Sequence, residues 1–389
     1  MSDPLVEAEW RLRPEVQAIF AALDGHRRRT RAVGGVVRDT IMGRSYSGDI
    51  DMATELLPEE VMERARAAGI AAHPTGIEHG TVTLTLGETL AEVTTLRRDV
   101  ETDGRRAVVA FGTDWVEDAS RRDFTLNALY CAADGTLYDP LGGVEDARNG
   151  IVRFIGDPAD RIAEDGLRVY RFFRLSASHG HERLDPDGLT ACAAAVGHLA
   201  HLSRERVGSE MLRMLALPKV AMTLAVMSEI RLLPLDDAIQ RALVAYESIG
   251  GQSATARLAL IGGADLDALQ AAWRLSKEMV TSARAILRAA ELLADDRIGE
   301  AAYRHGEKAV EGLAVAAALN QWGPARLAEA ARLLGATVVP PFPVTGHDLA
   351  GLGIAPGPAL GQELARLEQA WIGSGFALGK GELLALIKR

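Results

Sequence analysis

The chain is poor in cysteine and has no long apolar run. Its 389 residues include two cysteines, Cys131 and Cys192, which cannot supply a disulfide framework, so we expect a reducing compartment, the cytoplasm. No apolar run approaches the roughly 20 residues that a membrane-spanning helix needs. The first residues also lack the basic region and apolar stretch of a secretory signal. We therefore expect no contact with a membrane.

A net positive charge is missing as well. The chain carries 43 Lys and Arg against 53 Asp and Glu, a formal net charge of −10. This balance argues against a protein that coats nucleic acid indiscriminately, because such binding depends on phosphate neutralisation by basic side chains. Arginines nevertheless gather in short groups, which leaves room for a localised basic track. The 48% hydrophobic and 25% charged residues are typical of a globular chain with two or more domains.

Two kinds of pattern divide the chain near residue 145. Before it, short β-type runs alternate with helical stretches; after it, the sequence is helical almost throughout. We predict a small mixed sheet flanked by helices, with strands at 30–33, 49–53, 80–86 and 90–96 and helices at 36–42 and 58–68. The charged range 97–111 has no period and predicts a mobile loop. A proline-rich linker at 340–343 separates a last helical unit, 346–389.

Asp49 and Asp51 stand two positions apart in a predicted strand. Side chains alternate along an extended chain, so both carboxylates point the same way and could hold divalent metal together. Carboxylate oxygen suits Mg²⁺, and two such ions about 3.5–4 Å apart can serve phosphoryl transfer. A bare pair of this kind is also common in solvated turns, so its neighbours matter.

A strand followed by Gly34, Gly35 and a helix presents free backbone N–H groups, which bind phosphate well. Arg38, one turn into that helix, could add a charged fork. A tight turn is the simpler interpretation of two glycines. The aspartate pair downstream favours the phosphate site.

Two further segments carry paired charges. Arg122 and Asp123, at the start of a predicted apolar helix, could contact a nucleotide's phosphates and its ribose hydroxyls, or could simply cap that helix. Asp165, Arg168 and Arg171 follow helical spacing and share one face of a predicted helix over 161–174. A carboxylate beside a guanidinium can match the amino group and ring acceptors of cytosine or adenine. A surface ion pair is the alternative.

In this order, these motifs resemble those of class II CCA-adding enzymes, the family of tRNA nucleotidyltransferases and bacterial poly(A) polymerases. The matching strings are Gly34-Gly35-Val36-Val37-Arg38-Asp39, Asp49-Ile50-Asp51, Arg121-Arg122-Asp123-Phe124-Thr125-Leu126-Asn127-Ala128 and Glu164-Asp165-Gly166-Leu167-Arg168-Val169-Tyr170-Arg171. The resemblance implies an α+β fold: a polymerase-β-like nucleotidyltransferase head with a mixed sheet (1–145), a helical neck with the nucleotide-selecting helix (146–215) and a helical body and tail that bind tRNA (216–389).

The resemblance also implies roles for individual residues. Asp49 and Asp51 would be catalytic and would ligate two Mg²⁺ ions, with Glu92 a candidate third carboxylate. Asp165 and Arg168 would select CTP and then ATP without a nucleic-acid template. The partner would be the acceptor stem and T arm of tRNA, with no stable protein partner implied. The remaining nucleotide-binding residues implied are Gly34, Gly35, Arg38, Arg122, Asp123, Asn127, Arg171 and Arg174.

Full CCA addition is favoured over the related activities. The Gly-Arg-Arg-Phe-like element of bacterial poly(A) polymerases is absent after Asp51, and the charged stretch 99–106, shortened in enzymes that add only CC, is present. An A-adding or poly(A)-extending enzyme and a catalytically silent tRNA-binding protein remain the alternatives. Gly166 departs from the family pattern, in which a helix-forming residue is common at this position. Glycine costs about 1 kcal/mol relative to alanine in a helix interior and could loosen the selecting helix.

Overall fold

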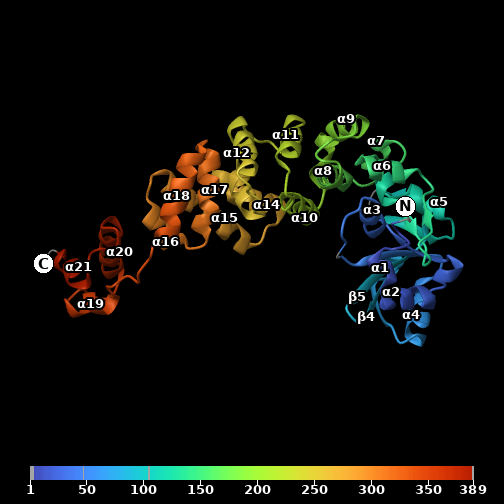
Figure 1. Cartoon of the computed structure of the whole chain (residues 1–389), viewed down its shortest axis with the longest axis horizontal. Helices are drawn as coiled ribbons and strands as arrows, with labels where there is room; N and C mark the ends of the chain where they lie inside the picture. The colour runs from blue at the N-terminus through green and yellow to red at the C-terminus, as the bar shows by residue number, and fades with distance from the viewer. Residues whose placement is uncertain (1–3, 47, 104–105, 388–389) are drawn as a thin grey trace. The chain divides into compact units, whose positions relative to one another are not determined.

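The computed structural model describes residues 4–46, 48–103 and 106–387. It contains two compact units, one formed by residues 1–214 and 226–234 and the other by residues 215–225 and 235–389 (Figure 1). Within the described ranges, no helix combines the length and apolar character that crossing a bilayer requires. The elements of each unit are given below.

The first unit is built on a mixed sheet whose strand order is β3-β4-β5-β2-β1-β8-β9. The β2–β5 pair is parallel and the other pairs are antiparallel, as the predicted mixed sheet requires. The predicted pairing of the strands near 80–86 and 90–96 is confirmed by the antiparallel β4–β5 ladder. The strands are β1 (Thr30–Val33), β2 (Ile50–Thr54), β3 (Ala71–Gly76), β4 (Thr81–Leu86), β5 (Thr89–Thr95), β8 (Tyr130–Cys131) and β9 (Leu137–Tyr138).

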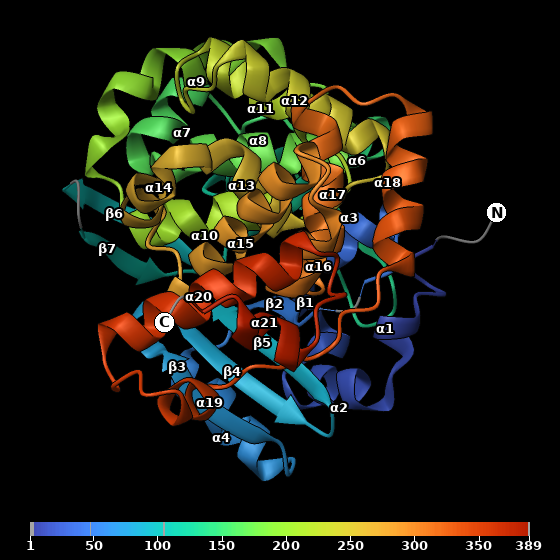
Figure 2. The same cartoon turned by 90° about the vertical axis from the view of Figure 1, so that its left-hand side faces the viewer.

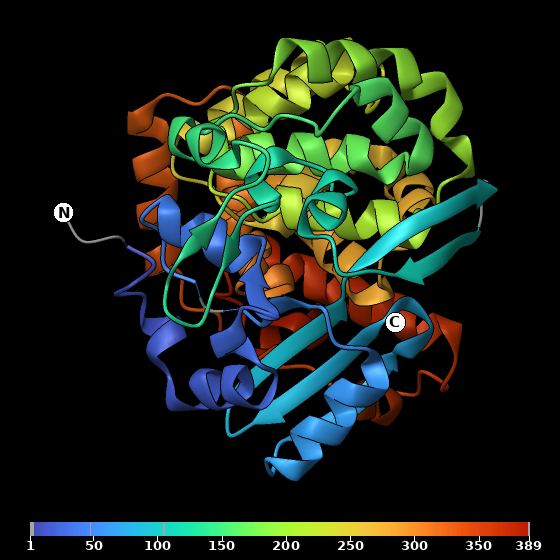
Figure 3. The same ribbon diagram turned by 90° about the vertical axis from the view of Figure 1, so that its right-hand side faces the viewer.

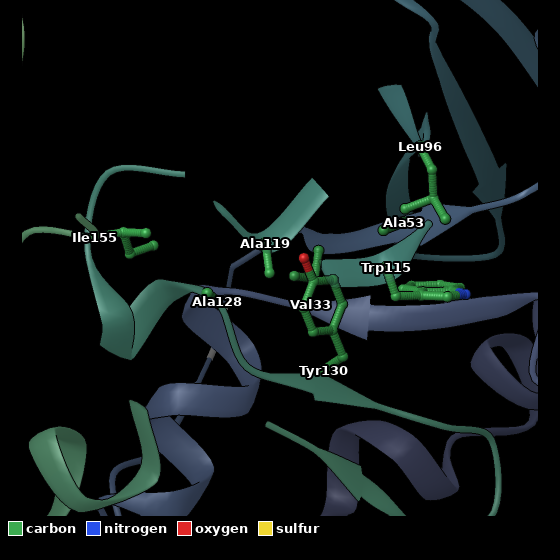
Figure 4. Close-up of a cluster of buried hydrophobic side chains, with 8 residues drawn as sticks. All are labelled: Val33, Ala53, Leu96, Trp115, Ala119, Ala128, Tyr130 and Ile155. Atoms are coloured by element: carbon green, nitrogen blue, oxygen red, sulfur yellow. The ribbon is translucent and has the colours of Figure 1, made fainter. Parts of the chain in front are cut away.

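Short helices surround this sheet because apolar side chains on β1, β2 and β5 must be covered. Helix α4 packs against β3, β4 and β5, and α2 contacts α4 (Figure 1). A separate apolar cluster forms where Val33 and Ala53 of the sheet meet Trp115 of α5 and Tyr130 of β8 (Figure 4). The helices are α1 (Glu9–Leu12), α2 (Pro14–Ala22), η1 (Gly25–Arg27), α3 (Gly35–Ile41), α4 (Pro58–Ala67), η2 (Ile77–His79), α5 (Trp115–Ser120) and η3 (Thr125–Asn127).

The loop predicted for 97–111 was wrong, because this range forms a two-stranded hairpin. Strands β6 (Arg97–Asp103) and β7 (Arg106–Phe111) pair antiparallel and belong to a sheet of their own (Figures 2 and 3). The last pair of the register is Asp103 with Arg106; residues 104 and 105 lie outside the described residues. The β-branched residues Val100, Thr102, Val108 and Val109 favour strands, and this preference outweighs the charge of the segment.

The helices that complete the first unit include a break where a continuous helix was predicted. Helix α7 ends at Glu164 and α8 begins at Leu167, so Asp165 lies between them with φ −148° and ψ 100°. A Cβ added to Gly166 would lie 2.8 Å from Leu199 Cδ2, which explains why glycine fits here. These helices are α6 (Gly143–Asn149), α7 (Pro158–Glu164), α8 (Leu167–His179), α9 (Pro186–Ala195), η4 (Val196–His201) and α10 (Arg204–Leu215).

The second unit is helical, as predicted. Its fully buried Arg257 donates to the backbone carbonyls of Leu215, Leu217 and Pro218 and to Glu247, and so joins the segment before α11 to α12 and α13. The helices are α11 (Ala221–Glu229), which is divided between the two units, and α12 (Asp237–Ser248), α13 (Ala254–Gly262), η5 (Gly263–Asp265), α14 (Leu266–Trp273), α15 (Lys277–Ala294), α16 (Ile298–His305), α17 (Lys308–Leu319) and α18 (Pro324–Ala336).

The last helices follow the proline-rich linker. They are α19 (Gly346–Gly351), α20 (Pro358–Gly373) and α21 (Lys380–Ala385), and they share an apolar cluster around Trp371. The His347-Asp348 dipeptide begins a helix: the Asp348 carboxylate accepts from the backbone N–H and the hydroxyl of Thr345 in a capping box.

Candidate functional site

A cavity of about 380 Å³ in the first unit is lined by six of the twelve predicted site residues. Its lining combines acidic and basic side chains. Asp51 of β2 contributes a carboxylate, and arginines from three separate segments contribute guanidinium groups. The predicted residues among its lining are Asp51, Arg122, Asp123, Asp165, Arg168 and Arg171.

The carboxylate end is set by the register of two parallel strands. Asp49 directly precedes β2, Asp51 is its second residue, and Glu92 lies opposite Asp51 on β5. Asp49, Asp51 and Glu92 all have exposed side chains. Partial burial, together with the negative charges of Glu92 and then Asp49, nevertheless raises the pKa of Asp51 to about 6, against the opposing charge of Arg122.

This crowding of carboxylates fits a divalent cation. Among the described residues, no group of three or more His, Cys, Asp or Glu side chains is already arranged to hold a metal. Mg²⁺ does not require such a cage, because it is usually held by one or two carboxylates together with substrate phosphates. The repulsion that raises the Asp51 pKa is what a cation would relieve, so the residues present fit the metal.

The glycine turn lies beside the aspartates. Gly34 has φ +73°, a conformation that favours glycine, and Gly35 begins α3. A Cβ added to Gly35 would lie 3.5 Å from Tyr46 Cε2 and 3.7 Å from Arg38 Nη2. The Tyr46 hydroxyl donates to the Asp49 backbone carbonyl over 2.6 Å. The turn is therefore bordered by Arg38 and by Tyr46, and Tyr46 connects it to the backbone of Asp49.

Arg38 is more deeply buried than the phosphate role suggested, with 8% of the residue exposed. Its Nη1 donates to Asn127 Oδ1 over 2.7 Å, and its Nε donates to Asp39 over 2.8 Å. Asn127 in turn donates to Asp123 Oδ1 over 3.0 Å. The predicted residues Arg38, Asn127 and Asp123 thus form one chain of hydrogen bonds.

The helix predicted to begin around Arg122 and Asp123 was wrong. Arg121 ends α5, and Asp123 leads into the 3-10 turn η3, which stops before the buried strand β8. The buried Asp118 accepts from Arg121 and Arg122, and Tyr130 also donates to it over 2.9 Å. Burial would raise the pKa of Asp118, but the two arginines hold it below its ordinary value. Asp118 therefore fixes both guanidinium groups at the cavity wall.

Asp123 joins this wall to α8. Its Oδ2 accepts from Arg171 Nε over 2.7 Å, and Oδ1 accepts from Asn127 and from the backbone N–H of Phe124. Burial would raise the pKa of Asp123, but Arg171 and the hydrogen bonds hold it below its ordinary value. The carboxylate is ionised at neutral pH.

Arg174 does not line the cavity. Its Nε donates to the buried Glu210 of α10 over 2.5 Å, and Arg171 Nη1 lies 3.9 Å from the same carboxylate. Arg174 therefore ties α8 to α10 and is not among the residues that line the cavity, and its implied nucleotide-binding role stays a prediction.

Asp165 and Arg168 both line the cavity but do not share a helix. Asp165 Oδ1 accepts from the Leu167 backbone N–H at the start of α8, and Oδ2 accepts from Arg206 over 2.7 Å. Arg168 donates to Glu164, to the Arg161 carbonyl over 2.8 Å and to the Arg121 carbonyl over 3.1 Å. The predicted helical face is therefore replaced by a helix break that brings the two groups to one wall.

Three polar residues at the site were not predicted. Thr94 and Arg97 line the cavity, as does Arg121, and Tyr46 borders the glycine turn. Thr94 follows Glu92 by two positions on β5, so strand alternation could have placed both on one face. Arg121 stands inside the quoted motif. No sequence pattern pointed to Tyr46, whose position depends on the loop before β2.

The sequence of this chain is similar to those of known proteins. The Poly A polymerase head domain matches residues 30–153. The mitochondrial CCA tRNA nucleotidyltransferase 1 of Homo sapiens is 32% identical over 92% of this chain and 86% of its own length. The CCA-adding enzyme of Lacticaseibacillus paracasei is 32% identical over 87% of this chain and 86% of its own length.

A solved structure agrees over nearly the same span. The CCA-adding enzyme of Bacillus stearothermophilus, crystallised in complex with CTP, superposes with a TM-score of 0.76 and 29% identity over 93% of this chain and 94% of that one. Sequence relatives and fold therefore coincide over both compact units, and the chain belongs to the family of CCA-adding tRNA nucleotidyltransferases.

Proposed function

We propose that this protein adds CCA to the 3′ end of tRNA, using CTP and ATP and no nucleic-acid template. The RNA 3′-hydroxyl attacks the α-phosphate of the bound nucleotide, and pyrophosphate leaves. The observation that carries the proposal is that one cavity is lined both by Asp51 and by Asp165 and Arg168. Asp51 is a carboxylate suited to a metal ion, and Asp165 and Arg168 are an acceptor and a donor suited to a base. The family supports the same reaction.

Asp49 and Asp51 would hold the metal, with Glu92 beside Asp51 as a third oxygen donor. Bound Mg²⁺ supplies positive charge to the triphosphate and lowers the pKa of the attacking hydroxyl. The protein's own contribution at this end is position, since the β2–β5 register fixes Asp51 and Glu92 and the Tyr46 hydroxyl fixes the backbone of Asp49. These carboxylates take no part in choosing the nucleotide.

The phosphate end would use the turn at Gly34 and Gly35, where Arg38 Nη2 lies 3.7 Å from the position of a Cβ on Gly35. Arg122, held by Asp118, supplies a second guanidinium. Asp123 would accept from a ribose hydroxyl, which requires the substrate to compete with or join the donors from Arg171 and Asn127. Arg38, Arg122 and Asp123 therefore handle parts that all nucleotides share.

Base choice would rest on Asp165 and Arg168. The Asp165 carboxylate can accept from the amino group of cytosine or adenine, and Arg168 can donate to a ring acceptor. Uracil and guanine present an oxygen where that amino group stands, so the carboxylate would face an acceptor and disfavour them. This discrimination comes from hydrogen-bond polarity, because an unpaired buried acceptor costs free energy.

The division into a head (1–145), a neck (146–215) and a body and tail (216–389) belongs to the same proposal. The helices of the second unit would hold the acceptor stem and T arm of tRNA. The cytoplasm remains the proposed compartment, and the support for it is that two cysteines in 389 residues supply no disulfide framework.

The deciding experiment is nucleotide incorporation by the purified protein with tRNA that lacks its 3′ end. We expect two C residues and one A with the mixture of CTP and ATP, and no addition with UTP or GTP. Incorporation of ATP alone would replace the proposal by an A-adding enzyme, and open-ended adenosine tails would replace it by a poly(A) polymerase. Binding of tRNA without any incorporation would indicate the catalytically silent alternative.

A further inference from the structure

A buried histidine touches the segment that carries the phosphate-binding arginine. His179 is the last residue of α8, and 7% of it is exposed. Its Nε2 lies 3.0 Å from Asp39 Oδ1, and its Nδ1 lies 2.6 Å from the Ser178 hydroxyl. Asp39 belongs to α3, so this contact joins two helices 140 positions apart in the sequence. The roles proposed above do not use His179.

The protonation of this histidine follows from its surroundings. Burial lowers the pKa of His179 below 6.5, and the charges of Arg38 and Arg44 act in the same direction, against Asp39. The ring is therefore neutral at pH 7.5. Because a carboxylate only accepts, Nε2 carries the hydrogen and donates to Asp39, while Nδ1 accepts from the Ser178 hydroxyl. His179 thus has both ring nitrogens paired and one orientation.

Asp39 connects His179 to Arg38. The oxygen that accepts from His179 also accepts from Arg38 Nε over 2.8 Å. With Arg38 Nη1 bonded to Asn127, two sides of the guanidinium are fixed, and Nη2 lies 3.7 Å from the position of a Cβ on Gly35. The remaining N–H groups of Arg38 are therefore aimed at the glycine turn.

We infer that His179 is a positioning residue for triphosphate binding: through Asp39 it holds Arg38 in the orientation that meets the phosphates at the Gly34–Gly35 turn. This inference rests on the proposed role of Arg38. Helix α8 would then serve the nucleotide at both of its ends, with Arg168 near its start reading the base and His179 at its end aiming the phosphate contact.

A purely structural role is the alternative, in which the buried hydrogen bond only holds α8 against α3. The two roles differ in what they change. Loss of a structural contact lowers the melting temperature and affects all ligands alike. If Arg38 loses its orientation, the affinity for ligands with three phosphates falls much more than the affinity for ligands with one. The preference for CTP over UTP does not change.

The test measures binding of CTP and CMP to the full-length protein by isothermal titration calorimetry without Mg²⁺. We expect His179→Ala to weaken CTP about tenfold, which corresponds to about 1.4 kcal/mol, and CMP less than about twofold. His179→Gln should recover most of the CTP affinity, because its side-chain amide can donate to Asp39. Ser178→Ala, which removes the partner of Nδ1 and a longer hydrogen bond of 3.3 Å to the Leu175 carbonyl within α8, should cause a smaller loss of the same kind.

Two controls separate the outcomes. His26→Gln alters an exposed histidine of η1 in the same unit and should change neither affinity. Arg38→Ala should weaken CTP at least as much as His179→Ala. Circular dichroism and the melting temperature establish that each variant is folded, and Ser178→Ala and His179→Gln carry the test if His179→Ala is not.

Three results would overturn the inference. Equal losses for CTP and CMP, or a lower melting temperature with unchanged CTP affinity, would return His179 to a structural contact while the role of Arg38 stands. An Arg38→Ala variant with normal CTP affinity would instead refute the proposed role of Arg38, and the inference with it.

Discussion

Arg171 of α8 donates from Nε to Oδ2 of Asp123 over 2.7 Å, although the two residues are 48 positions apart. This pair closes a chain of polar contacts that begins at Asp39 and runs through Arg38 and Asn127. The segments proposed to read the base and to bind phosphate are therefore held by one hydrogen-bonded network. Changes to one of its members should be felt by the others.

Breaking the Arg171–Asp123 pair should reduce stability. Arg171→Met leaves Asp123 buried with one charged partner fewer, and we expect a loss of about 2 kcal/mol in the free energy of unfolding. This is below the roughly 3–5 kcal/mol of a fully buried pair, because 33% of the Arg171 side chain is exposed. Urea denaturation measures the loss. The double variant Arg171→Met with Asp123→Asn should lose less than the sum of the two single variants, and strict additivity would show that the pair is not coupled.

Replacing Asp51 should separate activity from stability. Asp51→Asn should lower the transfer of both C and A by about 10³-fold, since the metal supplies several kcal/mol of transition-state stabilisation. The same variant should melt at a higher temperature without metal, because it removes a charge that burial, Glu92 and Asp49 disfavour. Affinity for tRNA should not change. Asp134→Asn, an exposed carboxylate of the same unit, serves as the control, and normal turnover in Asp51→Asn would contradict the metal-ligand role.

Replacing Arg168 should change selectivity more than rate. Arg168→Gln keeps a hydrogen-bond donor but loses the charged fork, so we expect the preference for CTP over UTP to fall by about tenfold or more, as one good base contact is worth about 1–3 kcal/mol. Single-turnover kcat/KM for each nucleotide measures it. Arg148→Gln, an exposed arginine of α6, should leave the preference unchanged. An unaltered preference in Arg168→Gln would make its contacts with Glu164 a surface ion pair.

Much of this site could be predicted from local sequence, because its parts follow short-range rules. Alternation along β2 predicted the position of Asp51, and the glycine pair predicted the turn between β1 and α3, whose phosphate role stays a prediction. What sequence missed depends on tertiary contacts. The break between α7 and α8 falls at Asp165, and the next residue, Gly166, lies close to Leu199, which is 33 positions later, so helical spacing alone cannot contain that contact. The same is true of the link between His179 and Asp39.

The loop predicted for residues 97–111 was wrong for a different reason. The segment is charged and aperiodic, which indicates a loop, whereas its β-branched residues favour strands. Charge limits how much apolar surface a segment can bury. A two-stranded ladder is held by backbone hydrogen bonds and needs little buried apolar surface.

His179 should make the stability of the protein depend on pH. Burial depresses its pKa in the folded state, so the unfolded chain binds the proton more readily in the window below 6.5. The stabilising contribution is therefore complete above pH 6.5 and is lost as the pH falls through the folded pKa. The charged groups that act on the ring are Asp39, Arg38 and Arg44. Melting temperatures between pH 7.5 and 5.5 should fall less steeply for His179→Gln than for the wild type, and identical slopes would contradict the assignment.

Gly166→Ala tests the break between α7 and α8. An unbroken helix and the observed break predict changes of opposite sign in the free energy of unfolding. In an unbroken helix, alanine would stabilise the protein by about 1 kcal/mol over glycine. In the structure, the added Cβ meets Leu199 Cδ2 at 2.8 Å, and relief of such overpacking costs about 1–3 kcal/mol. We therefore expect a net loss of stability in urea denaturation, with a weaker preference for CTP over UTP because Asp165 is the preceding residue. Gly197→Ala is the matched control, since a Cβ at Gly197 has no atom within 4 Å and should be tolerated. A more stable Gly166→Ala variant with unchanged selectivity would mean that Gly166 is not held against Leu199.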